Sequence, residues 1–367
     1  MDGVYEFVFP AIRGVQAGRE HFVTMCPLRL LPKLFALDDV DVFPELRAQR
    51  LLNRSRLPEI ARYMVENPGG YVFSSITASV DGDVKFTPSG GRPPASDLGT
   101  LRISMNSRFI LNDGQHRRAA IELALNERPE LADEAISLVL FVDQGLRRCQ
   151  QMFADLNRYA IRPSRSLGVL YDHRDDRADL ARMVVFKVPL FKDLTDLEKS
   201  TLSARARRLF TLSALYTATG ALLAGCSTRD PEARAAIAVS FWEGVSGQFQ
   251  QWAMVHSGTL SAGDVRQDFI HSHGVVLHAL GRVGCSLLQQ HPDDWPSVIQ
   301  RLQSIDWRRT NGALWEGRAM VGGRVSKSEQ HVTLTTNAIK TTLKLPLLPD
   351  ENRVEEEFIG SRNVVAA

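Results

Sequence analysis

The feature that most constrains the fold of this 367-residue chain is a change in pattern near residue 175. Before that point, β-branched and aromatic runs at 71–80, 100–111 and 136–142 alternate with helical segments, an order typical of α/β domains. Beyond residue 178 long helical patterns dominate, at roughly 195–224, 231–256, 264–290 and 294–304. The sequence therefore predicts an α/β domain over residues 1–175 and an all-α domain over residues 176–320.

Other segments refine this outline. Residues 20–35 predict a strand followed by a helix or turn, and residues 38–67 predict a helix that ends at the Pro-Gly-Gly cluster 68–70. The stretch 81–83, Asp-Gly-Asp, is typical of a hairpin turn, and residues 144–158 favour a helix. The C-terminal tail, residues 321–367, is expected to be partly irregular.

Composition narrows the possible partners and compartments. The 44 Lys and Arg residues nearly balance the 42 Asp and Glu residues, so nucleic acid would need a local basic face. The charge-free stretch between Arg208 and Arg229 is too polar for a good membrane span, which predicts a buried core helix. Since the N-terminus also lacks the pattern of a signal peptide, we expect a cytoplasmic protein with no membrane partner.

The four cysteines do not form a CxxC unit, so no zinc site or disulfide framework is predicted. Cys149 follows two arginines that favour a lowered thiol pKa, although a structural thiol is the simpler interpretation. His271 and His273, with His278 and Asp268, predict a His-rich helix, but a spacing of two residues does not place side chains on one helix face. We therefore predict no metal site. Three tryptophans are interpreted as core or interface residues: Trp295, Trp307 and Trp315.

The most informative segment runs from Phe109 to Arg118. An apolar strand ends near Leu111, a glycine permits a turn, and a helix begins near Gln115. The first turn of a helix offers unpaired N–H groups and the positive end of the helix dipole, so it suits an anion. The side chains of residues 116–118, His-Arg-Arg, would add donors, while Asp113 suits either a helix cap or a position facing a metal ion or a substrate hydroxyl. The alternative is an ordinary capped helix with a solvated arginine pair.

The string Asp-Gly-Gln-His-Arg resembles the motif of the DGQHR-domain family, which is similar to the ParB and sulfiredoxin fold. In that fold the corresponding turn, with a glycine and an arginine, cradles nucleotide phosphates. The resemblance implies an α/β N-terminal ParB/sulfiredoxin-like domain. It also implies a nucleotide- or phosphate-binding site formed by Asp113, Gly114, Gln115, His116 and Arg117.

Further segments resemble the DndB family of the DNA phosphorothioation, or sulfur modification, system. The similar segments, within about residues 20–320, are 47–50, 53–63, 152–158, 162–167, 170–174, 197–203 and 209–214. No activated cysteine pair or persulfide loop is evident, so the sequence does not predict the modifying enzyme itself.

Arginines gather on both sides of the motif in the sequence. If these clusters share a face with the turn, they form a phosphate-lined groove for double-stranded DNA. The alternative is a set of solvated helix faces. The predicted DNA-binding residues are Arg47, Arg50, Arg54, Arg56, Arg147, Arg148, Arg158, Arg162 and Arg165.

Three functions follow from this resemblance and these clusters. The first is a DNA-binding regulator, a transcriptional repressor of the sulfur-modification genes. The second is a nucleotide hydrolase coupled to DNA, with ATP and Mg²⁺ as cofactors and Asp113, His116 and Arg117 as catalytic residues. The third is an assembly factor for other sulfur-modification proteins, which leaves the turn without a role. A homo-oligomer is compatible with each.

Overall fold

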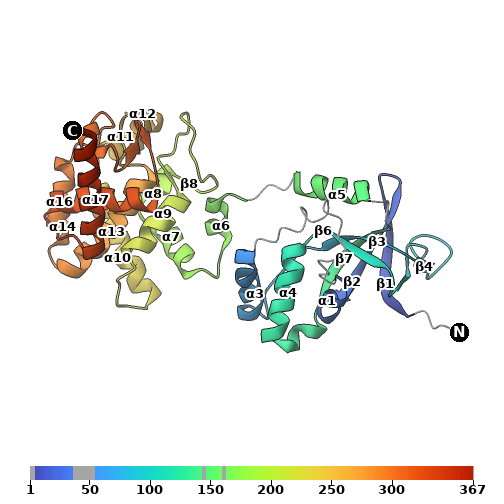
Figure 1. The fold of residues 1–367 in the computed structure, drawn as a ribbon. Coiled ribbons are helices and arrows are strands. Elements are labelled where there is room, and N and C mark those ends of the chain that lie inside the picture. Colours follow the sequence, from blue (N-terminus) through green and yellow to red (C-terminus); the bar gives the residue numbers. More distant parts are fainter. Residues whose placement is uncertain (1–4, 36–53, 143–145, 159–162, 367) are drawn as a thin grey trace. The chain divides into compact units, whose positions relative to one another are not determined.

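The computed structural model shows two compact units, Met1–Ile161 and Arg162–Ala367. The structure describes residues 5–35, 54–142, 146–158 and 163–366 (Figure 1). The first unit contains a seven-stranded mixed sheet, and the second is predominantly helical. The chain is therefore an α/β unit followed by a mainly α unit, as the sequence pattern predicts.

The sheet of the first unit has the spatial order β4-β5-β1-β2-β7-β3-β6. Its neighbouring strands are antiparallel except for β3 and β7, which run parallel. The strands are β1 (Glu6–Gln16), β2 (Arg19–Pro27), β3 (Ile76–Asp81), β4 (Val84–Pro88), β5 (Leu98–Ser104), β6 (Arg108–Asp113) and β7 (Ala135–Val142). Strand β1 is absent from the sequence prediction, because it lacks the alternation of apolar and polar residues that indicates a half-buried strand. Val8 and Ile12 on its exposed face are as apolar as Phe9 and Ala11 on its buried face.

Helices cover both faces of this sheet. They are α1 (Leu31–Leu34), α3 (Leu57–Glu66), α4 (Gln115–Glu127) and α5 (Leu146–Arg158). Because alternate residues of a strand point to opposite faces, Ile76, Ala78 and Val80 of β3 share a core with α3 and α4, whereas Ser79 faces α5. Figure 1 shows α4 and α5 on opposite sides of the sheet.

Two local predictions in this unit are wrong. Residues 100–111 form the ends of two strands, since the chain turns at 105–107 and β5 and β6 pair with different neighbours. The turn at 81–83 does not close a hairpin, because β4 pairs with β5 while β3 pairs with β6 and β7. Local turn signals do not reveal which strand a segment will meet across a sheet.

The second unit consists mainly of helices and two small two-stranded sheets. The helices are α6 (Arg165–Tyr171), α7 (Asp176–Lys187), α8 (Pro189–Leu194), α9 (Leu212–Leu222), α10 (Pro231–Ser246), α11 (Gln250–His256), α12 (Ala262–Asp268), α13 (Gly274–Gln290), α14 (Trp295–Val298), α15 (Gly312–Trp315), α16 (Glu329–Leu343) and α17 (Pro349–Ala366). The strand pair β8 (Thr195–Asp196) with β9 (Phe210–Thr211) corrects the prediction of an all-α domain over residues 176–320. A second pair, β10 (Met320–Val321) with β11 (Arg324–Val325), lies at the start of the predicted tail.

Two predicted helical segments and the predicted C-terminal tail also differ from the structure. Residues 197–209 form loops that precede α9, and the segment predicted as one helix over 264–290 is interrupted at residues 269–273. The backbone N–H of Ile270 in this break donates to the carbonyl of Trp307, so tertiary pairing replaces helical bonding there. The tail, expected to be partly irregular, is more regular than that expectation suggests, because it contains α16 and α17 with loop residues between them.

Helix α13 lies at the centre of the core of this unit, packed against α9 and α16. Gly281 allows close approach to α9, since a Cβ atom there would lie 2.2 Å from the carbonyl oxygen of Ala218. The segment between Arg208 and Arg229 contains α9, whose residues Leu212, Leu215 and Ala218 are buried, which confirms the predicted core helix. None of the helices in the described ranges combines the length and apolar character needed to span a bilayer.

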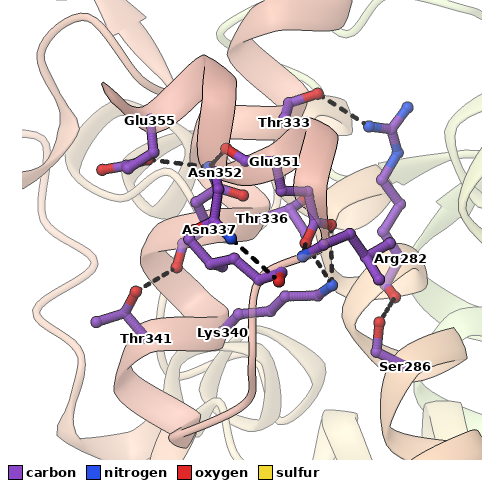
Figure 2. Close-up of polar contacts among 12 residues, drawn as sticks. Arg282, Ser286, Thr333, Thr336, Asn337, Lys340, Thr341, Glu351, Asn352 and Glu355 are labelled. Carbon is purple, nitrogen blue, oxygen red and sulfur yellow. Dashed lines mark hydrogen bonds and ion pairs between the residues drawn. The ribbon is translucent and has the colours of Figure 1, made fainter. Parts of the chain in front are cut away.

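A buried polar network joins α16 to α17 (Figure 2). The ammonium group of Lys340, a residue only 1% exposed, donates to both carboxylate oxygens of Glu351, at 2.8 and 2.7 Å. Asn337 donates to the carboxylate of Glu355 at 3.0 Å, and Arg318 forms an ion pair with the same carboxylate. The C-terminal helix is thus held by specific polar contacts as well as by apolar packing.

Candidate functional site

The DGQHR segment forms a strand–turn–helix. Strand β6 ends at Asp113, Gly114 is the N-cap of α4, and the helix begins at Gln115. Gly114 has φ +100°, and a Cβ atom at this position would lie 2.9 Å from Cγ1 of Ile76, so glycine is required for both conformation and space. No side chain accepts a hydrogen bond as an N-cap, and the first turn contains no acidic residue. The start of α4 therefore has the properties of an anion site.

An ion pair spans the motif. Nη2 of Arg117 lies 2.6 Å from Oδ2 of Asp113, and their side chains are 17% and 43% exposed. Asp113 therefore contacts Arg117 and does not cap the helix, which excludes one of the two roles that the sequence left open. Gln115 donates from its side-chain amide to the carbonyl of Leu111 at 3.4 Å, which links the helix start to the strand.

His116 occupies a positively charged setting. Burial lowers the pKa of its imidazole below 6.5, and the nearby charge of Arg56 lowers it further. The lowered pKa favours the neutral imidazole, the form that can accept a proton. Arg56 comes from the first predicted basic cluster, so the structure brings at least one member of that cluster close to the motif.

Arg118 does not face a ligand. It is 2% exposed, and its Nη1 atom donates to Glu122 one turn further along α4, at 2.7 Å. The expectation that residue 118 adds a donor at the turn is therefore wrong. The reason is helical periodicity, since Arg118 shares the buried face of α4 with Ile121.

Asn112 lies immediately before the motif and supports the turn, a role that the sequence did not predict. It is completely buried, and its amide donates to Oγ of Ser79 at 2.8 Å and to the sulfur of Met152 at 3.2 Å. These contacts link the end of β6 to β3 and α5, so they position the turn. The only sequence signal is an asparagine within an otherwise apolar strand end.

The predicted DNA-binding arginines have different locations. Arg47, Arg50 and Arg162 lie outside the described residues, as do the side chains of Arg54, Arg147 and Arg158. Arg148 lines a cavity of about 270 Å³ beside Ser79, Met152 and Asp155. Arg165 belongs to the second unit, where its guanidinium lies 5.7 Å from the ring centre of Tyr216.

The remaining candidates have structural surroundings. His271 is completely buried and accepts a hydrogen bond from Nε1 of Trp252 at 2.9 Å. It lies with His273 in the break between α12 and α13, so the prediction of a single His-rich helix is wrong. Within the described residues, no group of His, Cys, Asp and Glu is arranged to hold a metal ion. Cys149 is 1% exposed, as the structural interpretation predicts. Trp307 and Trp315 are buried, and Trp295 packs against the same core.

These features define a protein with an α/β unit, a mainly helical unit and a helix start at Gly114 that no side chain caps. The family described as DndB, DNA-sulfur modification-associated, matches residues 9–346. The chain belongs to this family, as its resemblance in several segments predicts. No curated protein and no solved structure shows significant similarity to it.

Proposed function

We propose that the chain is a DNA-binding regulator, a transcriptional repressor, of the DNA phosphorothioate modification system. Membership of the DndB family places it in the context of DNA sulfur modification. In this proposal the DGQHR turn binds a phosphate, and the resemblance to the ParB and sulfiredoxin fold supports that role. Double-stranded DNA, other sulfur-modification proteins and further copies of the chain are the proposed partners.

The observation that carries the proposal is the charge around the start of α4. The helix begins after Gly114 with no acidic residue in its first turn, and Arg117 and Arg56 add positive charge nearby. A phosphate at this position would gain from the helix dipole and from charge-assisted hydrogen bonds. Asp113 is the present partner of Arg117, so the carboxylate and an incoming phosphate compete for one guanidinium.

This competition can be tested by the direction in which a substitution of Asp113 changes the affinity for DNA. Asp113→Asn removes the competing charge, and we expect tighter binding to DNA from upstream of the protein's own gene in a gel shift. Arg117→Ala should weaken binding and reduce the steepness of its salt dependence, since each phosphate contact contributes to that dependence. Arg102→Ala is a matched control, because Arg102 pairs with Glu6 on β1 and lies far along the sheet from β6. Absence of DNA binding at low salt would refute the proposal.

A second candidate function is ATP hydrolysis coupled to DNA binding. It is favoured by a neutral imidazole, that of His116, next to the helix start, since such a group can accept a proton from water. Mg²⁺-ATP would supply the phosphates and the metal, with Asp113 beside them and Arg117 stabilising developing charge.

The same variants separate the two functions. A catalytic role for Asp113 predicts that Asp113→Asn abolishes turnover in a phosphate-release assay with Mg²⁺ and duplex DNA, whereas competition alone predicts tighter DNA binding and no turnover in any variant. Turnover that persists unchanged in Arg117→Ala would remove the turn from the catalytic mechanism.

A further inference from the structure

The second unit contains a cavity of about 720 Å³, a volume within the usual range for small-molecule sites. It lies among the start of α6, the loop 200–204, the start of α9, α12, the start of α13 and the segment around β11. All of these segments belong to the second unit, Arg162–Ala367, whereas the DGQHR turn belongs to the first.

Positive charge dominates the walls of this cavity. No Asp or Glu is among its lining residues, whereas five cationic side chains are: Arg165, Arg266, Arg309, Arg324 and Lys327. Within the described part of the chain, none of these five forms an ion pair with an acidic side chain. Arg266 is buried, Arg309 is half-buried and the other three cations are more exposed, so the cavity wall is a surface of uncompensated positive charge that suits an anion.

One of the five has a structural role. The guanidinium of Arg266 donates to the backbone carbonyls of Ser203, Ala204, Ala206 and Arg208, and so holds the loop that forms one wall. The other four cations have no comparable set of backbone acceptors: Arg165 lies over the ring of Tyr216, and Nη2 of Arg309 lies 3.3 Å from Nε2 of His273, with the charge of Asp268 nearby. Burial and the charge of Arg165 lower the pKa of Lys327, as expected for cations held close together without a counter-ion.

The start of α13 adds to this potential. The helix begins at Gly274, and no side chain accepts a hydrogen bond as its N-cap. A Cβ atom at Gly274 would lie 3.4 Å from Nζ of Lys327, so the ammonium group lies beside the positive end of a 17-residue helix. A bound anion would stabilise both.

Unpartnered polar atoms in the wall give an independent indication. Ser272 is 4% exposed, and in the described structure its Oγ atom has no hydrogen-bond partner. Nε of Arg309 is likewise buried without an acceptor. Both residues line the cavity, so a ligand with several acceptor oxygens would satisfy donors that the protein leaves unmet.

We propose that this cavity is a second anion site, which binds a polyphosphate such as that of a nucleoside di- or triphosphate. Four converging cations and a helix start suit several negative charges in one place better than the single charge of a phosphodiester. The site does not depend on the function proposed for the DGQHR turn. Ligand occupancy would link the helical unit to the nucleotide state of the cell.

The test is isothermal titration of the full chain with ATP and with inorganic pyrophosphate, both without Mg²⁺. We expect Lys327→Ala and Arg309→Ala each to weaken binding by at least about tenfold, the effect of losing a charge-assisted hydrogen bond. Lys327→Arg should restore part of the affinity. The exposed Lys187 on the same unit provides the control Lys187→Ala, which should bind like the wild type.

A second measurement does not depend on the variants folding. All five tryptophans belong to the second unit, so their fluorescence reports the unfolding of that unit alone. Pyrophosphate should raise the temperature of this transition in the wild type, because a ligand that binds only the folded state stabilises it. No shift and no titration heat would overturn the proposal.

Other outcomes are equally decisive. Polyphosphate binding lost in Arg117→Ala but retained in Lys327→Ala would place the ligand at the DGQHR turn and refute a site in this cavity. A second outcome also overturns the proposal: the wild type does not bind polyphosphate, and Lys327→Ala has a reduced affinity for a 20-base-pair duplex. The cavity would then receive a phosphate of DNA.

Discussion

The buried ion pair between Lys340 and Glu351 allows a quantitative prediction. Lys340 is 1% exposed and Glu351 has a side chain 12% exposed, so neither charge is well solvated (Figure 2). Lys340→Ala leaves the carboxylate with the backbone N–H of Leu348, at 2.8 Å, as a remaining donor. Removing one partner of a buried pair typically costs 3–5 kcal/mol. Because Glu351 retains that donor and some solvent, we expect the lower end, about 3 kcal/mol.

Urea unfolding followed by tryptophan fluorescence measures this loss in the second unit, which contains all five tryptophans. The double variant Lys340→Met, Glu351→Gln removes both charges and should recover most of the stability, since no uncompensated charge remains. Arg353→Ala is the matched control on α17, the helix that carries Glu351. Its pair with Asp350 is exposed at 69% and 94%, and its loss should cost no more than about 0.5 kcal/mol. A cost for Lys340→Ala as small as that of the control would refute the reasoning.

Three further predictions concern the turn, the histidines and the central helix. Gly114→Ala should destabilise the first unit by about 1–3 kcal/mol and weaken DNA binding, because φ at this position is +100° and the new Cβ would meet Ile76. Circular dichroism melting measures the loss of stability, and the gel shift measures the loss of DNA binding. Burial lowers the pKa of His271 to about 3 and that of His273 to about 4 in the folded state. In the unfolded state both have a pKa near 6.5, so as the pH falls below 7 the unfolded state binds more protons than the folded state. The second unit should therefore lose about 2 kcal/mol per histidine between pH 7 and pH 5, and equal urea midpoints at the two pH values would contradict this. Gly281→Ala should lower the tryptophan-detected melting temperature, because its Cβ would meet the backbone of α9, and an unchanged value would show that the helices separate easily.

Much of the local structure could be predicted from the sequence. The helix after Gly114, the strand ending at 142 and the helix within 144–158 all agree with the structure, because their signals are short-range. Hydrophobic periodicity, a glycine at a turn and β-branched runs act over a few residues. The family resemblance also arose from local strings, and the family match over residues 9–346 confirms it.

The arrangement of the candidate site was only partly predictable. The sequence indicated which residues surround Gly114, but it did not show that Asp113 would pair with Arg117 or that Arg118 would face the core. Those outcomes depend on the direction in which α4 presents its side chains to the sheet. The support from Asn112 depends on contacts with β3 and α5, which are distant in sequence.

The sequence by itself determined the change from α/β to helical architecture and the glycine-led start of α4. Only the tertiary structure decided which strands pair, where the helix predicted over 264–290 breaks, and that cations from 165, 309, 324 and 327 surround one cavity. The physical reason is that propensity and periodicity act within a few residues. Charge accumulation and strand pairing, in contrast, arise between segments that only the folded chain brings together.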